Sequence, residues 1–132
     1  MSYLLDSHTL IWSIIDRKKL SLKARRILED RDNRILVSAI SFWEISLKYA
    51  LGKLDLNGVT PEQLPELARQ TGFELIELQP DEGANYHQLQ ASWHRDPFDR
   101  MLIWQALQNK LSIISRDTQI ASYKSVGLNV VW

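Results

Sequence analysis

The residues Tyr3-Leu4-Leu5-Asp6-Ser7, close to the N-terminus, set the pattern that decides the fold. The apolar run that ends at Asp6 predicts a short buried strand. From Ser7 to Ile15 the apolar residues recur at helical spacing, so a helix is expected directly after the strand. A short buried strand that leads into a helix is the unit from which parallel sheets are built.

The same alternation continues along the chain. Further strands are predicted at 35–37, 73–78, 111–114 and 128–131, and further helices at 21–30, 41–51, 60–70, 80–92, 96–109 and 118–123. This order predicts an α/β fold with a mainly parallel sheet that is covered on both faces. Because no long linker interrupts the pattern, one domain is expected over residues 1–132.

Composition excludes several classes of protein. The chain has no cysteine, which excludes a disulfide scaffold and thiolate metal sites. No apolar run approaches the roughly 20 residues that a membrane helix needs, and the N-terminus lacks the features of a signal peptide. A cytoplasmic protein without a membrane partner is therefore expected. The net charge is zero, so contact with nucleic acid would depend on where the basic residues lie.

Acidic side chains follow the predicted strands at one end of the sheet. Asp6 follows the first strand, Glu44 lies in the helix after the second, and Asp117 follows the strand at 111–114. Residues just beyond the carboxyl ends of parallel strands face one crevice, so these carboxylates are expected to converge. Asp99 can join them from the start of its helix.

Each acid also has a plain structural interpretation as a helix cap. Ser41 and Glu44 have the spacing of a capping box, and Asp96 stands directly before a proline, as a good N-cap residue does. Asp6 and Asp117 can cap the helices that follow them. The two interpretations are compatible, because a carboxylate at a helix N-terminus can cap the helix and bind a ligand.

A group of converging carboxylates needs neutralisation. Two carboxylates about 6 Å apart repel by roughly 3 kcal/mol at an effective dielectric constant near 20. Protons or a cation must therefore neutralise them. Oxygen ligands without cysteine or paired histidine suit Mg²⁺ or Mn²⁺. Such an ion activates water and stabilises phosphate oxygens, so the predicted reaction is metal-assisted phosphoester hydrolysis.

Four blocks of sequence carry a resemblance that spans nearly the whole chain. They are Leu4-Leu5-Asp6-Ser7-His8, Ser38-x-x-Ser41-x-x-Glu44, His94-Arg95-Asp96-Pro97-Phe98-Asp99-Arg100 and Ile114-Ser115-Arg116-Asp117. In this order they resemble the PIN-domain family and, within it, the VapC-type toxins. The resemblance implies a three-layer α/β/α sandwich and a metal-dependent endoribonuclease that hydrolyses RNA phosphodiester bonds.

The resemblance also implies roles for single residues. The acidic pocket that holds Mg²⁺ or Mn²⁺ and carries the catalysis would consist of Asp6, Glu44, Asp99 and Asp117. Asp96 and Ser115 would support this pocket from beside the ligands. Ser7 stands where the family usually has threonine, and it keeps the hydroxyl group.

Partners are implied by the resemblance alone. Proteins of the VapC type are typically held inactive by a small antitoxin whose tail lies across the acidic groove, and they commonly form homodimers. The expected partners are therefore an RNA substrate, an antitoxin and a second copy of the chain.

Basic residues beside the acids have two interpretations. Arg95, Arg100 and Arg116 are candidates for contacts with RNA phosphates, and solvent exposure or salt bridges to the acids are equally good alternatives. Lys48 is interpreted as the partner of a helical ion pair with the acid four residues before it. His94 is interpreted as a polar loop residue, although an imidazole there also suits acid–base catalysis.

Two rival functions remain to be tested. A phosphoacceptor receiver-like domain also has an acidic Mg²⁺ pocket, but it has paired acids after the first strand, and only Asp6 stands there. The second rival is a catalytically silent RNA- or protein-binding module on the same fold. The presence of all four expected acids argues against that module.

Overall fold

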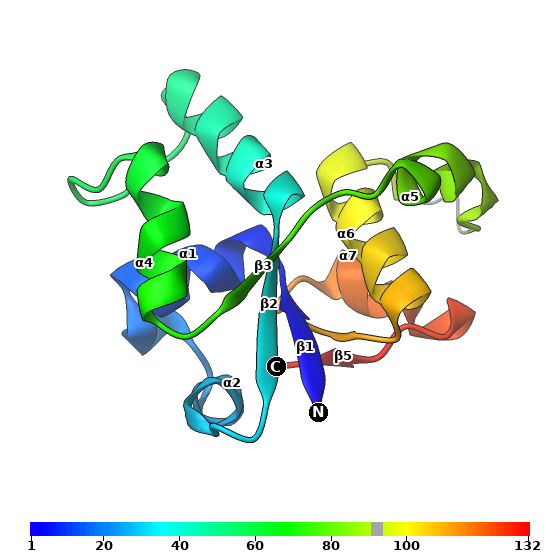
Figure 1. The fold of residues 1–132 in the computed structure, drawn as a ribbon, viewed down its shortest axis with the longest axis horizontal. Coiled ribbons are helices and arrows are strands. Elements are labelled where there is room, and N and C mark those ends of the chain that lie inside the picture. Colours follow the sequence, from blue (N-terminus) through cyan, green and yellow to red (C-terminus); the bar gives the residue numbers. More distant parts are fainter. Residues whose placement is uncertain (91–93) are drawn as a thin grey trace.

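A computed structural model describes residues 1–90 and 94–132. Its centre is a five-stranded sheet in the order β3-β2-β1-β4-β5 (Figure 1). The strands are β1 (Ser2–Leu5), β2 (Arg34–Ser38), β3 (Glu74–Ile76), β4 (Ser112–Ile114) and β5 (Val130–Val131). All four strand pairs are parallel, which confirms the predicted sheet.

Helices connect the strands. In the described part of the chain these are α1 (Ser7–Ile15), α2 (Leu22–Glu29), α3 (Ala39–Ala50), α4 (Leu64–Gln70), α5 (Pro80–Asn85), α6 (Pro97–Asn109) and α7 (Thr118–Ala121). Short 3-10 helices lie at Arg17–Lys19, Pro61–Gln63, Tyr86–Gln88 and Ser122–Val126. No helix in the described ranges is long and apolar enough to cross a membrane.

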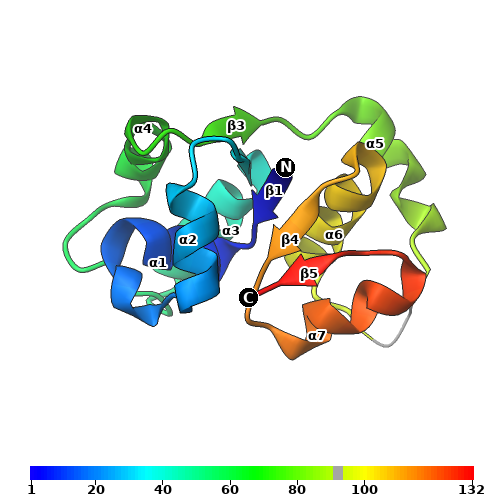
Figure 2. The same cartoon turned by 90° about the horizontal axis from the view of Figure 1, so that it is seen from below.

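Helices cover both faces of the sheet, because successive strand residues point to opposite sides. Leu5 and Val37 belong to the core cluster that α1, α2 and α4 cover. Leu4 and Leu36 belong to the cluster on the other face, where α6 and α7 pack. Figures 1 and 2 show the two groups of helices on opposite sides of the strands. The expected three-layer sandwich is therefore confirmed.

The helix after the second strand begins earlier than the sequence pattern predicts. Ser38 ends β2 and also caps α3, and its Oγ accepts a hydrogen bond from the backbone N–H of Ile40. The interpretation of Ser41 and Glu44 as a capping box is therefore wrong. Ser41 is buried inside the helix, and its Oγ has no hydrogen-bond partner among the described residues. The capping interpretation of Asp6, Asp96 and Asp117 is confirmed.

Two other predicted helices are shorter than expected. The segment 60–70 divides into a 3-10 helix and α4, because Pro65 has no N–H to extend an α-helical ladder backwards. The predicted helix 80–92 stops after Asn85 and continues as a 3-10 turn at Tyr86–Gln88. Gly83 and Asn85 are weak helix formers, which favours this early end. Residues 91 and 92 lie outside the described residues.

Candidate metal centre

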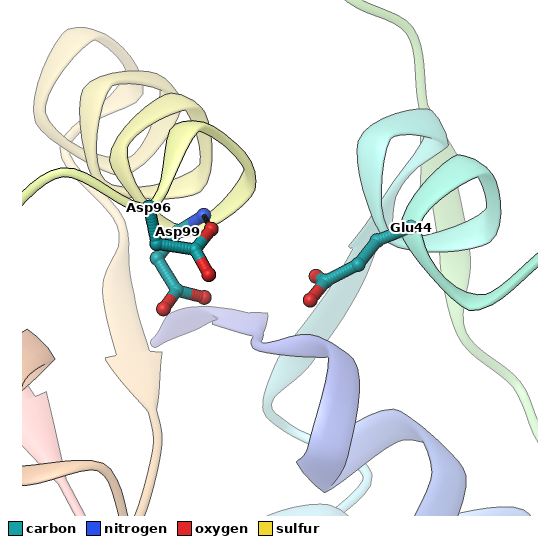
Figure 3. Close-up of side chains that lie close together, drawn as sticks. All are labelled: Glu44, Asp96 and Asp99. Carbon is teal, nitrogen blue, oxygen red and sulfur yellow. Dashed lines mark hydrogen bonds between the residues drawn. The ribbon is translucent and has the colours of Figure 1, made fainter. Parts of the chain in front are cut away.

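Three carboxylates meet at the carboxyl edge of the sheet. Glu44 projects from α3, and Asp96 and Asp99 project from the start of α6 (Figure 3). Each offers a carboxylate oxygen, and these three oxygens lie within 4.8 Å of one another. The fold thus joins acids from two helices that are far apart in the sequence.

Glu44 is held from two sides. Its side chain is buried, and its Oε1 accepts a hydrogen bond of 2.6 Å from Ser7 Oγ. Its Oε2 forms an ion pair with Lys48 one helical turn later, as predicted. Burial lowers the pKa of Lys48, but the hydrogen bond with Glu44 and the nearby acids raise it above its ordinary value overall. Lys48 is therefore a cation that faces the acidic cluster.

Asp96 has a structural contact as well as a place in the cluster. Its Oδ1 accepts hydrogen bonds from the backbone N–H groups of Phe98, at 2.9 Å, and Asp99, at 3.1 Å. These are the contacts of an N-cap residue. Asp96 was expected to support the pocket from beside the ligands, and the structure brings its carboxylate as close to Glu44 as a ligand would need.

The pKa of Asp99 reflects the unfavourable electrostatics of the cluster. Burial raises its pKa to about 8, and the negative charges of Asp96, Glu44, Asp6 and Asp117 act in the same direction. Without a cation this carboxyl group therefore keeps its proton near neutral pH. An ion that bound here would compete with that proton.

Asp6 and Asp117 lie beside the three clustered carboxylates and are not part of that tight group. Asp6 is buried, and its two oxygens accept hydrogen bonds from Thr9 N, at 2.8 Å, and Ser115 Oγ, at 2.5 Å. Burial raises the pKa of Asp6, although these hydrogen bonds oppose the shift. The exposed Asp117 donates its backbone N–H to Ser115 Oγ. Ser115 thus connects the two acids, close to the position expected for it.

An open cavity of about 380 Å³ adjoins Asp6. Its lining consists of Asp6, His8, Trp12, Arg116, Asp117 and Thr118. The guanidinium of Arg116 lies 6.0 Å above the centre of the Trp12 ring, in a cation–π geometry. A positive charge and an aromatic ring therefore stand beside the buried acid.

The three arginines that were candidates for RNA contacts have different surroundings. Arg95 and Arg116 are exposed. Each of the three guanidinium nitrogens of Arg100 donates to a protein oxygen, and the acceptors are the hydroxyls of Tyr86 and Tyr123 and the carbonyls of Leu89 and His94. These contacts give the partly buried Arg100 a structural role, and its contact with RNA phosphate stays a prediction.

Some contacts of the site were not foreseen from the sequence. His94 was interpreted as a polar loop residue, yet its side chain is buried and its Nε2 lies 3.5 Å from Asp99 Oδ2. Tyr123 touches His94 from 29 residues away, and nothing in the sequence indicates this. Ser7 follows Asp6 directly, and this position at the strand end indicates that it lies near the acids, although not that it contacts Glu44.

The chain belongs to the PIN domain family, since the family profile matches residues 3–126. It is similar to Ribonuclease VapC22 of Mycobacterium tuberculosis (strain ATCC 25618 / H37Rv), with 26% identity over 129 residues that cover 98% of this chain and 97% of the relative. The resemblance inferred from the four sequence blocks is thereby confirmed.

Solved structures share the fold. A chain of VapBC2 from Rickettsia felis bound to a promoter DNA fragment aligns with a TM-score of 0.68 at 17% identity, over 99% of this chain and 98% of that one. A chain of a toxin–antitoxin complex from Klebsiella pneumoniae aligns with a TM-score of 0.61 at 22% identity, over 98% and 96%. At these identities the likeness concerns the fold alone.

Proposed function

We propose that this protein is a metal-dependent endoribonuclease that acts as the toxin of a toxin–antitoxin pair. The observation that carries the proposal is the group of carboxylate oxygens from Glu44, Asp96 and Asp99 within 4.8 Å of one another, in a chain of the PIN domain family. The similarity to a protein named Ribonuclease VapC22 supports RNA as the substrate.

The donor set fits a hard divalent cation. All the candidate ligands are carboxylate oxygens, which Mg²⁺ and Mn²⁺ prefer. Burial, and then the neighbouring acids, raise the pKa of Asp99, so its negative charge is poorly stabilised without a cation. We assign Asp6, Glu44, Asp99 and Asp117 as the ligand set, and the position of Asp96 makes it a candidate for direct binding too.

The chain's own residues orient this set. Ser7 and Lys48 hold the two oxygens of Glu44, and Ser115 holds Asp6. A bound divalent ion would supply an activated water and would stabilise negative charge on the phosphate during hydrolysis. Arg95 and Arg116 are exposed and stand next to the acids in the sequence, and we propose that they contact phosphates of the RNA.

The proposed partners are an antitoxin and a second copy of the chain. One of the similar structures is a toxin–antitoxin complex, which supports an antitoxin as partner, and we propose that it lies across the acidic pocket. Helix α3 exposes Trp43 and Leu47 one turn apart on one face, and its C-cap residue Leu51 is exposed as well. An exposed apolar face of this kind supports a homodimer. We also propose a cytoplasmic location, which the proposed RNA substrate supports.

The first test is cleavage of a mixed RNA pool by the purified protein, freed of any antitoxin, in Mg²⁺ or Mn²⁺. We expect cleavage that EDTA stops and that Asp6→Asn abolishes. Asp32→Asn removes an exposed carboxylate from a turn and is the matched control, which is expected to cleave like the wild type. If the folded wild-type protein cleaves no RNA but binds it, the silent binding module is the better function.

A further inference from the structure

His94 lies between a candidate metal ligand and a buried tyrosine. Its Nε2 is 3.5 Å from Asp99 Oδ2, and its Nδ1 is 3.1 Å from the hydroxyl of Tyr123. The His94 side chain is 5% exposed and Tyr123 is fully buried, so protein groups surround both rings. The Tyr123 hydroxyl also accepts a hydrogen bond of 2.9 Å from Arg100 Nη1.

One arrangement of the hydrogen atoms satisfies the contacts among Arg100, Tyr123 and His94. A guanidinium group only donates hydrogen bonds, so the Tyr123 oxygen is the acceptor for Arg100. The hydroxyl hydrogen of Tyr123 can then point to His94 Nδ1. A ring nitrogen that accepts a hydrogen bond carries no proton, so the proton of the neutral imidazole is on Nε2, on the side of Asp99.

We propose that Arg100 and Tyr123 fix the tautomer of His94, and that His94 in turn acts as a positioning residue that directs the Asp99 carboxylate toward Glu44 and Asp96. The proposal rests on the proposed function in one respect, namely that Asp99 is a metal ligand. Hydrogen-bonded neighbours of metal ligands commonly set the orientation of those ligands and raise metal affinity.

The row also explains why Arg100 is withdrawn from solvent. Its Nε donates to the Tyr86 hydroxyl at 2.7 Å, while Nη1 donates to Tyr123 and to the carbonyl of His94. The two tyrosines thus make similar contacts with the guanidinium group. In the described structure Tyr123 contacts the imidazole of His94, whereas the contacts found for Tyr86 are with Arg100.

This difference gives a matched pair of variants. Tyr123→Phe and Tyr86→Phe each remove one hydroxyl from Arg100, but Tyr123→Phe also removes the hydrogen bond to His94. The tautomer of His94 is measured by long-range ¹H–¹⁵N NMR of the ring in the metal-free protein. The affinity for Mn²⁺ alone is measured by calorimetry, and thermal unfolding confirms that both variants are folded.

We expect the Nε2–H tautomer in the wild type and in Tyr86→Phe, and a mixture of tautomers in Tyr123→Phe. We also expect Tyr123→Phe to lower Mn²⁺ affinity roughly tenfold, with Tyr86→Phe near the wild type. An unchanged tautomer and affinity in Tyr123→Phe would overturn the inference. So would an equal loss of affinity in both variants, because that result would assign the effect to Arg100 alone.

A further pair of variants covers the case in which Tyr123→Phe does not fold. His94→Gln keeps an N–H donor near Asp99 and should keep most of the Mn²⁺ affinity, whereas His94→Leu should lose most of that affinity. Equal Mn²⁺ affinities of the two His94 variants would contradict the proposal.

A wild-type protein that binds Mn²⁺ but cleaves no RNA contradicts the proposed function. The tautomer and affinity measurements then still decide the positioning role.

Discussion

At the scale of single residues, Asp99 is a group whose negative charge the fold tolerates poorly. Its pKa is raised to about 8 by burial and by the acids around it, above the ordinary value of 3.8. Between these two pH values the folded protein holds a proton that the unfolded chain releases. The stability of the metal-free protein therefore falls as the pH rises through this range, and below it the penalty is absent.

Asp99→Asn removes this penalty. Without metal, we expect the variant to be more stable than the wild type by about 2 kcal/mol at about pH 8, and to differ little at about pH 4. Denaturant unfolding in EDTA measures the difference, with Asp32→Asn as the exposed control. A gain of the same size at both pH values would show that the charge of Asp99 is not its cause.

Single residues also show where prediction from the sequence stops. The positions of Asp6, Glu44, Asp99 and Asp117 followed from where strands end and helices begin. Their hydrogen bonds to residues far along the chain did not, because contacts such as that between Ser7 and Glu44 join side chains 37 residues apart and depend on rotamers and exact helix rotation. The ligand set itself stays a prediction.

At the scale of elements, the start of α6 combines a structural and a chemical task in Asp96. Its Oδ1 caps the helix, and its carboxylate lies in the acidic cluster. Serine is also a good N-cap residue but carries no charge, whereas alanine can do neither. The two tasks can therefore be separated by substitution at this position.

We expect Asp96→Ser to be more stable than Asp96→Ala by about 1 kcal/mol, because only serine keeps the cap. If the carboxylate binds the ion, both variants should lose Mn²⁺ affinity to a similar extent. Thermal unfolding and calorimetry measure the two effects on the same samples. A Mn²⁺ affinity like that of the wild type in Asp96→Ser would show that Asp96 serves the helix alone.

Element boundaries were less predictable than element types. The strands and the helices alternate as expected, yet α3 starts at Ala39 because Ser38 leaves β2 and caps the helix without an intervening loop. Periodicity shows which face of a helix is apolar, but it does not show which of two nearby serines accepts the first backbone N–H. Glu44 is consequently deeper in its helix than a capping residue would be.

At the scale of the whole molecule, a cation at the cluster should stabilise the fold. An ion that binds only the folded protein adds about 2.7 kcal/mol at a concentration of about 100 times its Kd. We expect this stabilisation by Mn²⁺ to be larger at about pH 8 than at about pH 6, because binding must displace the proton of Asp99.

Thermal unfolding with and without Mn²⁺ at the two pH values tests this expectation. Asp6→Asn should reduce the effect, and Asp32→Asn should leave it unchanged. Equal stabilisation of the wild type and Asp6→Asn would mean that the ion binds elsewhere.

The parallel sheet and its two covered faces were predictable from the strand–helix alternation. The strand order was not, because periodicity does not say which strands pair.

The order of the strands has a consequence for how the protein is made. β1 lies between β2 and β4, and the acids that complete the cluster with Glu44 come from the last third of the chain. A ribosome releases Asp6 and Glu44 first, and α6 and β4 can pack against β1 only after residue 114 has emerged. A nascent chain that ends before α6 therefore lacks the assembled cluster. The proposed nuclease would stay inactive until the codons for α6 and β4 have been translated.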